Sequence, residues 1–223
     1  MNTRTQGFLL LLFGGALLRI GVSDLLLRYV RPAARPWVIL AGFGLLILAL
    51  AQLVSAHRQR AAHEPTTRTG WLILAPVLAM VVIAPPALGA FSASRTPSQV
   101  HPQNHKEFSA LTGSDPHRLA LFDFTTRILW DGARSLNGVE VELTGFVLSQ
   151  RPDGFVLARL VITCCAADAR PIEVVVHTTQ HPVDDSWVAT TGRYVGTDPA
   201  APTLPILAAT SISSVTEPRD PYE

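Results

Sequence analysis

Three apolar runs near the N-terminus constrain this chain more than any other feature of its sequence. The runs span residues 7–27, 37–56 and 71–90. A helix needs roughly 20 predominantly apolar residues to cross the hydrocarbon core of a bilayer. The second and third runs meet that requirement, and Trp37 and Trp71 stand at their starts, where aromatic side chains favour the headgroup level. We therefore predict an α-helical membrane anchor over residues 1–91, with two or three spans.

Two ionisable residues, Arg19 and Asp24, interrupt the first apolar run. An ionisable side chain at the centre of a span costs about 2.5–3.5 kcal/mol on insertion scales, so it usually pairs, snorkels or has a function. Two interpretations are open. Either both side chains lie near one membrane interface, or they face a partner membrane protein.

The orientation of the anchor is not decided by its arginines. Each connection between apolar runs contains three of them: Arg28, Arg31 and Arg35 in the first, and Arg58, Arg60 and Arg68 in the second. The positive-inside rule therefore gives no preference. With three spans, the two ends lie on opposite sides of the bilayer, and a short N-terminus is easily kept inside. We expect a multi-pass protein of the cell membrane whose C-terminal domain is extracytoplasmic.

Residues 92–116 are polar and contain prolines without a hydrophobic period, which predicts a linker. The linker contains His101 and His105, which have the i,i+4 spacing of a helical metal chelate. Pro102 argues against a helix here, so we interpret both histidines as solvated.

Residues 117–223 have the pattern of a small all-β domain. Val139, Val141 and Leu143 alternate with polar residues, as in a half-buried strand, and Gly145 is expected at a bulge. Further extended segments are expected at 154–163, 171–177, 187–195 and 204–212, after a short helix or irregular segment over 119–130. Five short strands favour a closed or half-closed antiparallel barrel, OB-like in size, with a small sandwich as the alternative.

The charge of the chain argues against a nucleic-acid partner. The formal net charge is +1, and the predicted β domain lacks a basic and aromatic stripe. Binding to phosphates requires clustered positive charge, and binding to single strands also uses aromatic platforms. We therefore expect no nucleic acid among the partners, and the apolar runs imply the lipid bilayer instead.

The only two cysteines, Cys164 and Cys165, are adjacent and lie between the second and third predicted strands. Successive side chains of a strand point to opposite faces, so both sulfurs reach one ion only if the strand ends by Thr163. In that case both turn toward Asp168. Two thiolates and a carboxylate suit zinc or another thiophilic ion. Cys164, Cys165 and Asp168 are therefore the candidate metal ligands.

Three other hypotheses for the cysteines stay open. In the first, both cysteines are small buried apolar residues. In the second, they form a redox pair whose strained disulfide bond is labile. In the third, one of them is a covalent catalyst. The sequence places no histidine as the base of a catalyst, so we expect no enzymatic activity. His177 and His181 are left out of the site, because a hairpin around residues 166–170 puts His177 about 20 Å from the cysteines.

The C-terminal half resembles the YcgQ-like family of bacterial membrane proteins, which is uncharacterised. The matching residues are Gly138–Val147, Phe155, Ala158-Arg159, Cys164-Cys165-Ala166-Ala167-Asp168-Ala169, Pro171, Asp185–Val188, Gly192, Pro205-Ile206, Glu217-Pro218 and Pro221-Tyr222. The adjacent cysteines with the following Ala-Asp-Ala are the specific part. Members of that family combine a hydrophobic N-terminus with this domain and are typically encoded beside YcgR-like predicted permeases. Some have a histidine-rich loop between spans, which is reduced here to His57 and His63.

The resemblance implies an accessory subunit of a transport system. We therefore predict a membrane-anchored, non-enzymatic partner of a permease, whose β domain binds a metal through Cys164, Cys165 and Asp168. One alternative is a thiol-redox or metal-handling envelope protein that acts without the permease. Another is a structural envelope protein with inert, buried cysteines.

Overall fold

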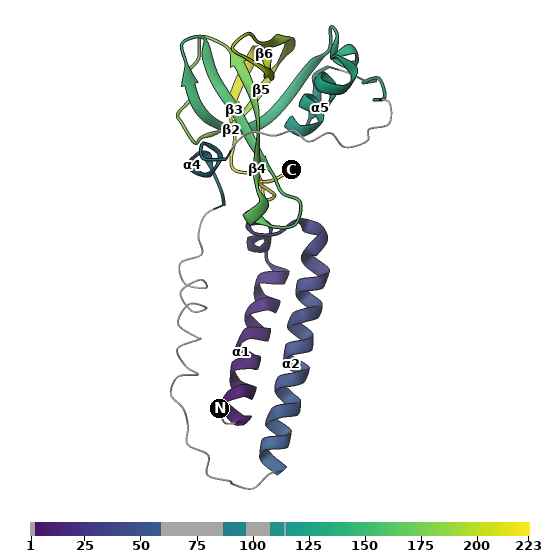
Figure 1. The fold of residues 1–223 in the computed structure, drawn as a ribbon, viewed down its shortest axis with the longest axis vertical. Helices are drawn as coiled ribbons and strands as arrows, with labels where there is room; N and C mark the ends of the chain where they lie inside the picture. The colour runs from purple at the N-terminus through teal and green to yellow at the C-terminus, as the bar shows by residue number, and fades with distance from the viewer. Residues whose placement is uncertain (1–2, 59–86, 97–107, 114) are drawn as a thin grey trace. The chain divides into compact units, whose positions relative to one another are not determined.

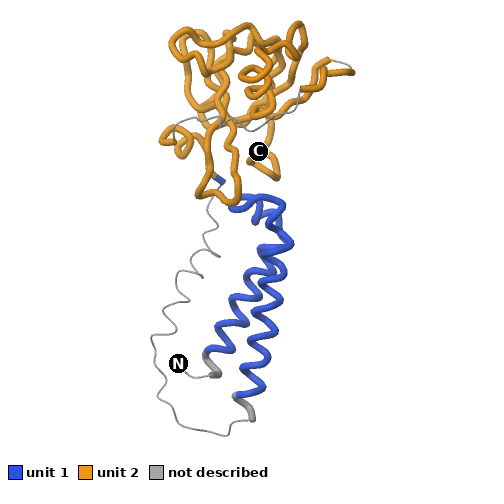
Figure 2. The backbone as a smooth tube through the Cα atoms, turned by 45° about the vertical axis from the view of Figure 1, so that its right-hand side comes forward, with its two compact units in different colours: residues 1–87 blue, residues 88–223 orange. Residues whose placement is uncertain are grey.

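The computed structural model describes residues 3–58, 87–96, 108–113 and 115–223 (Figure 1). The chain divides into two compact units, residues 1–87 and residues 88–223, which are shown in different colours in Figure 2.

The first unit contains two apolar helices, α1 (Thr3–Val22) and α2 (Arg35–Arg58). Two 3-10 turns, η1 (Asp24–Arg28) and η2 (Pro32–Ala34), connect them. Among the described residues, one helical stretch, Pro32–Ser55, is long and apolar enough to cross a membrane, and Gln6–Val22 is a shorter apolar helix. Of the two or three predicted spans, the structure supports one. The third predicted span, 71–90, lies outside the described residues up to position 86.

Glycines on α1 allow the two helices to pack closely. Gly7, Gly14 and Gly21 recur every seven residues, which is close to two helical turns, so they share one face. A Cβ added at any of them would lie 3.0 Å or less from a side-chain atom of α2. Small residues at such an interface let helix backbones approach each other, which is the usual packing mode of helices in lipid.

Asp24 has a partner within the first unit. Its carboxylate lies 3.8 Å from the guanidinium of Arg35, which also donates hydrogen bonds of 2.8 Å to the main-chain oxygens of Gly21 and Val22. These oxygens belong to the last turn of α1, where carbonyls lack helical partners. Asp24 therefore pairs with Arg35 beside the end of α1.

The second unit is built around a closed five-stranded β-barrel (Figure 1). Its strands are β2 (Glu140–Arg151), β3 (Gly154–Val161), β4 (Arg170–His177), β5 (Trp187–Asp198) and β6 (Ala201–Ser214). The order is β2-β3-β4-β6-β5, and β5 closes the barrel by pairing with β2. The neighbours are antiparallel except β4 and β6, which are parallel. Of the two predicted architectures, the barrel is confirmed.

A helix and a short extra strand precede the barrel. β1 (His117–Leu119) pairs in parallel with the first half of β2. Helix α5 (Leu121–Asp131) then contributes Leu121, Phe124 and Ile128 to the barrel core. These residues have the i, i+3, i+7 spacing of one helix face, which explains why this segment is helical rather than irregular.

The predicted bulge at Gly145 is wrong. Gly145 pairs in regular register with Val188, and the register shift in β2 lies between Val147 and Ser149. Gly145 instead permits a close approach of β3, because a Cβ there would lie 2.5 Å from the main-chain oxygen of Ala158. A glycine within a strand marks a close backbone approach as often as a bulge, and here it marks the close approach.

The second unit also begins earlier than the predicted linker boundary at residue 92. It starts at Leu88, and the short helix α4 (Ala90–Ala93) packs on the outer face of the barrel beside Phe146. The N–H of Ala90 donates a 2.8 Å hydrogen bond to the carboxylate of Asp185. Residues 88–93 therefore form part of the β domain's outer layer. The remainder of the predicted linker from 97 to 107, with both histidines, lies outside the described residues.

Candidate metal centre

Strand β3 is covered on both faces, and its end determines where the cysteine loop begins. Phe155 and Leu157 belong to the barrel core, whereas Ala158 and Leu160 pack in the outer cluster that includes α4. β3 ends at Val161, opposite the first residue of β4. The cysteines therefore lie beyond the strand, in the connection formed by residues 162–169. The alternation of faces no longer separates their side chains.

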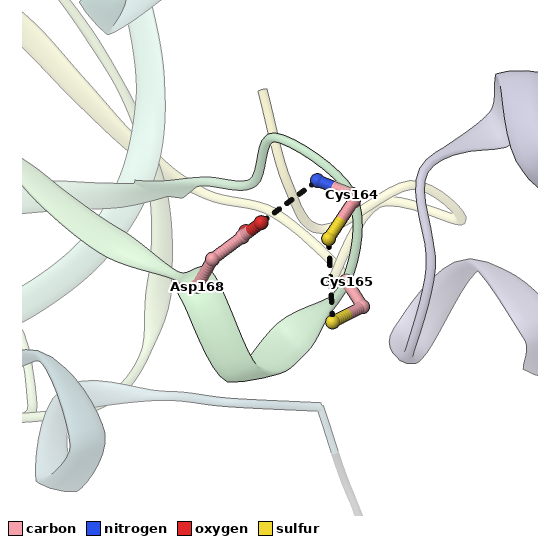
Figure 3. A group of neighbouring side chains, drawn as sticks. All are labelled: Cys164, Cys165 and Asp168. Atoms are coloured by element: carbon pink, nitrogen blue, oxygen red, sulfur yellow. Dashed lines mark hydrogen bonds between the residues drawn. The ribbon is translucent and has the colours of Figure 1, made fainter.

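This cysteine loop (residues 162–169) brings the three predicted ligands together (Figure 3). One ligand atom from each of Cys164, Cys165 and Asp168 lies within 4.8 Å of the others. The two Sγ atoms are 3.6 Å apart, and both cysteines are free thiols. Two sulfur ligands of a tetrahedral zinc ion, each at about 2.3 Å, are separated by about 3.8 Å. The donor set and its spacing thus fit a thiophilic ion with a fourth position left open.

Asp168 also organises the main chain of the loop. Its two carboxylate oxygens accept hydrogen bonds of 2.9 Å from the N–H groups of Thr163 and Cys164. The 3-10 turn η5 (Ala166–Asp168) closes the loop, and the N–H of Asp168 donates to the oxygen of Cys165 at 3.0 Å. A carboxylate has about four lone-pair positions, so these bonds leave capacity for a metal.

The charges in the loop favour a protonated thiol beside an ionised carboxylate. A hydrogen bond to the Asp168 carboxylate, followed by one to Cys165, raises the pKa of the Cys164 thiol from 9.0 to about 11. For Asp168, burial works toward a higher pKa. Hydrogen bonds from the Cys164 thiol and from the loop amides outweigh it, and the pKa lies below its usual value. A metal ion that binds here displaces the proton of Cys164.

The two histidines left out of the site lie away from it. His177 pairs with Gly154 at the far end of the β3–β4 hairpin, and its Nε2 is 2.9 Å from the carboxylate of Asp153. The Nδ1 of His181 lies 3.3 Å from Oε1 of Gln150. The predicted hairpin register is therefore confirmed. Neither histidine is placed as a catalytic base for the cysteines.

Sequence reasoning assigned no role to residues 220–223, which lie beside the end of β3. Tyr222 forms a parallel β-bridge with Leu160, and Glu223 exchanges main-chain hydrogen bonds with Leu160 and Ile162. This polar, proline-containing tail has no hydrophobic period that would indicate pairing. The burial of Tyr222, at 4% exposure, could not be read from its neighbours in the sequence.

One protein-family model matches the C-terminal part of the chain. Residues 125–223 match the family model described as DUF1980 C-terminal domain. The matched part contains most of α5, all five barrel strands and the cysteine loop. It fits an uncharacterised family, and its description names no activity. Comparisons with curated proteins and with solved structures gave no match.

Proposed function

We propose that this chain is a membrane-anchored accessory subunit of a permease, and that its barrel binds a thiophilic metal ion such as zinc. The ligands are Cys164, Cys165 and Asp168. Metal binding rests on one observation, which is that two free thiols 3.6 Å apart lie beside a carboxylate in a single short loop. The anchor is supported by the apolar helix Pro32–Ser55. The permease partner and the extracytoplasmic placement rest on the resemblance to the YcgQ-like family.

The donor set suits a metal that is presented rather than buried. Structural zinc sites have four protein ligands, whereas sites that exchange ligands keep one position open. The three residues provide two soft sulfurs and one carboxylate, which favours thiophilic ions over calcium or magnesium. Cys164 is exposed, so a ligand from a partner protein has access to the open position.

Zinc titration of the full-length chain in detergent tests the metal site. With a chromophoric chelator as competitor, the wild-type chain is expected to bind one zinc ion. Cys164→Ser and Cys165→Ser are each expected to weaken binding by at least about 100-fold, because each removes a direct ligand. A wild-type chain that leaves all zinc on the chelator would overturn the proposal.

Two further measurements test the partner and the placement. Co-expression with a YcgR-like permease is expected to give a complex that survives affinity purification of either chain. Arg19→Leu, which removes an exposed ionisable side chain of α1, is expected to reduce that complex. A membrane-impermeant maleimide is expected to label the cysteines in intact cells. Labelling only after lysis would place the β domain in the cytoplasm.

A thiol-redox function is the second candidate, and the sulfur separation of 3.6 Å favours it. Reaction with a low-molecular-weight disulfide would join the two Sγ atoms and release two thiols of the reagent, with two electrons passing from the protein. Adjacent Cα atoms are about 3.8 Å apart, whereas most disulfides span 4.4–6.8 Å, so the bond would be strained and easily reduced. Mass spectrometry of alkylated protein, with and without reductant, detects this bond as a loss of two hydrogens.

A further inference from the structure

The barrel seam between β2 and β3 is incomplete at the end nearest the cysteine loop. The two strands pair from Arg151 opposite Gly154 to Phe146 opposite Ala158. Beyond Ala158, β3 continues without β2, whose residues 141–143 pair with β1 instead. The edge of β3 that leads into the cysteine loop therefore lacks a barrel neighbour on this side.

The tail formed by residues 220–223 occupies that edge. The N–H of Glu223 donates to the oxygen of Leu160 at 2.9 Å, and the N–H of Ile162 donates to the oxygen of Glu223 at 3.2 Å. Ile162 precedes Thr163, whose N–H is held by Asp168. The tail thus supplies the last main-chain hydrogen bonds on this side of β3 before the ligands begin.

The side chain of Glu223 fixes the tail to helix α5. Its two carboxylate oxygens accept hydrogen bonds of 3.0 and 2.8 Å from the N–H groups of Leu121 and Phe122. These are first-turn donors that have no partner within the helix. The carboxylate side chain is 9% exposed, and Leu121 is fully buried in the barrel core, so the attachment point is rigid.

Arg159 holds the tail from the opposite side. Its guanidinium donates to the main-chain oxygens of Asp220 at 2.9 Å and Pro221 at 3.3 Å, and it lies 3.6 Å from the carboxylate of Glu223. It also lies over the ring of Trp187 on β5, at 5.6 Å from the centroid. Arg159 is therefore attached to the tail and to the barrel wall at the same time.

We propose that Glu223 and Arg159 are positioning residues of the cysteine site. They press the tail onto the open edge of β3, fix Ile162, and thereby hold the loop in the geometry that gathers Cys164, Cys165 and Asp168. Neither residue is a metal ligand. The expected change in zinc affinity rests on the proposed metal binding, whereas the expected change in the order of the loop does not. A loop that is already ordered loses less conformational freedom when a metal binds, so loosening the tail weakens the site.

Three variants of the full-length chain test the proposal. Glu223→Ala removes the carboxylate that attaches the tail to α5, and Glu223→Gln keeps the shape of the side chain and one acceptor oxygen. Asp198→Asn is the matched control. Asp198 is also a poorly exposed carboxylate, which accepts from Arg151 at 2.8 Å and from the N–H of Ala200 at 2.9 Å. It contacts the β2–β3 turn, at the other end of β3. The control therefore reports loss of barrel stability without disturbance of the cysteine loop.

The readouts are the unfolding temperature, the zinc dissociation constant, and the alkylation rate of each cysteine in the metal-free chain. Glu223→Ala is expected to weaken zinc binding about 10-fold, the usual effect of removing a supporting partner. It is also expected to speed alkylation of Cys164 by loosening its hydrogen bond to Asp168. Glu223→Gln is expected to be intermediate. Asp198→Asn is expected to lower the unfolding temperature with wild-type zinc affinity and alkylation.

The outcomes separate this inference from the proposed function. Wild-type zinc affinity and wild-type alkylation in Glu223→Ala, with a lowered unfolding temperature, would make the tail purely structural and overturn the inference. A wild-type chain without zinc binding refutes the metal site, and the alkylation rates then decide the positioning role alone. If Glu223→Ala does not fold, Arg159→Lys takes its place, because lysine keeps the charge but not the fixed fork of donors. An unchanged alkylation rate in a folded Arg159→Lys chain would likewise overturn the inference.

Discussion

Strand β3 is entered and left through two turns that each contain an aspartate, and the two aspartates have different surroundings. Asp153 in the β2–β3 turn lies 2.9 Å from Nε2 of His177 and 3.6 Å from Nε of Arg151. Asp168 in the cysteine loop accepts hydrogen bonds from main-chain N–H groups and from a thiol. The first carboxylate has basic side chains as partners. Among the described residues, the second has only neutral donors, so its charge remains to attract a cation.

The lengths of the two turns differ as well. The β2–β3 turn needs only Pro152 and Asp153 to reverse the chain, whereas residues 162–169 connect β3 to β4. A reversal does not require eight residues, since two-residue hairpins are common. The longer connection gains the space in which adjacent side chains can converge. The short turn is sufficient to reverse the chain, and the longer one has the room that the proposed metal site requires.

Gly154→Ala, directly after the short turn, is expected to have the largest effect. It tests whether the two turns have separate roles. Gly154 has a φ of +144°, and a Cβ there would collide with the main-chain oxygen of Val176. The free energy of unfolding is expected to fall by about 3 kcal/mol, as measured by denaturant titration of tryptophan fluorescence. The folded chain is expected to bind zinc with wild-type affinity. A weaker zinc site would show that the two turns are coupled.

The next prediction compares substitutions of the two aspartates directly. Asp168→Asn is expected to weaken zinc binding about 30-fold, because it removes a ligand charge and one main-chain acceptor. It is also expected to speed alkylation of Cys164 at pH 8 about 10-fold, because the main cause of the raised pKa is gone. Asp153→Asn serves as the control and is expected to change neither quantity. Equal effects of both substitutions would remove the functional distinction between the turns.

The last prediction concerns pH. Because the pKa of Cys164 is about 11, zinc must displace its proton, and the apparent affinity is expected to rise about 10-fold per pH unit from that residue. Competition titrations between about pH 6 and 8 measure the change in log affinity per pH unit, which equals the number of protons released on zinc binding. This number is expected to be lower by one in Cys164→Ser. The stability of the metal-free domain is expected to follow the opposite trend. A thiol pKa raised from 9.0 to about 11 stabilises the fold below pH 9, and that contribution is lost as the pH rises through 11.

The sequence allowed most of the barrel to be predicted, because alternation along each strand reflects burial in the core. It also predicted that Cys164, Cys165 and Asp168 converge once β3 ends before Thr163. The end of β3 could not be derived, because Val161, Ile162 and Thr163 continue the apolar run without a breaker. The role of Glu223 was hidden for another reason. Its partners, Leu121 and Phe122, lie about a hundred residues earlier, and local patterns do not report such distant contacts.

The hydrogen bond of 3.1 Å from the N–H of Leu88 to the hydroxyl of Tyr222 joins the two ends of the β domain. A domain whose ends meet can be excised, permuted or inserted into another protein without stretching its connections. Tyr222 is the sequence neighbour of Glu223, so this junction of the two ends lies beside the residue proposed to position the cysteine loop.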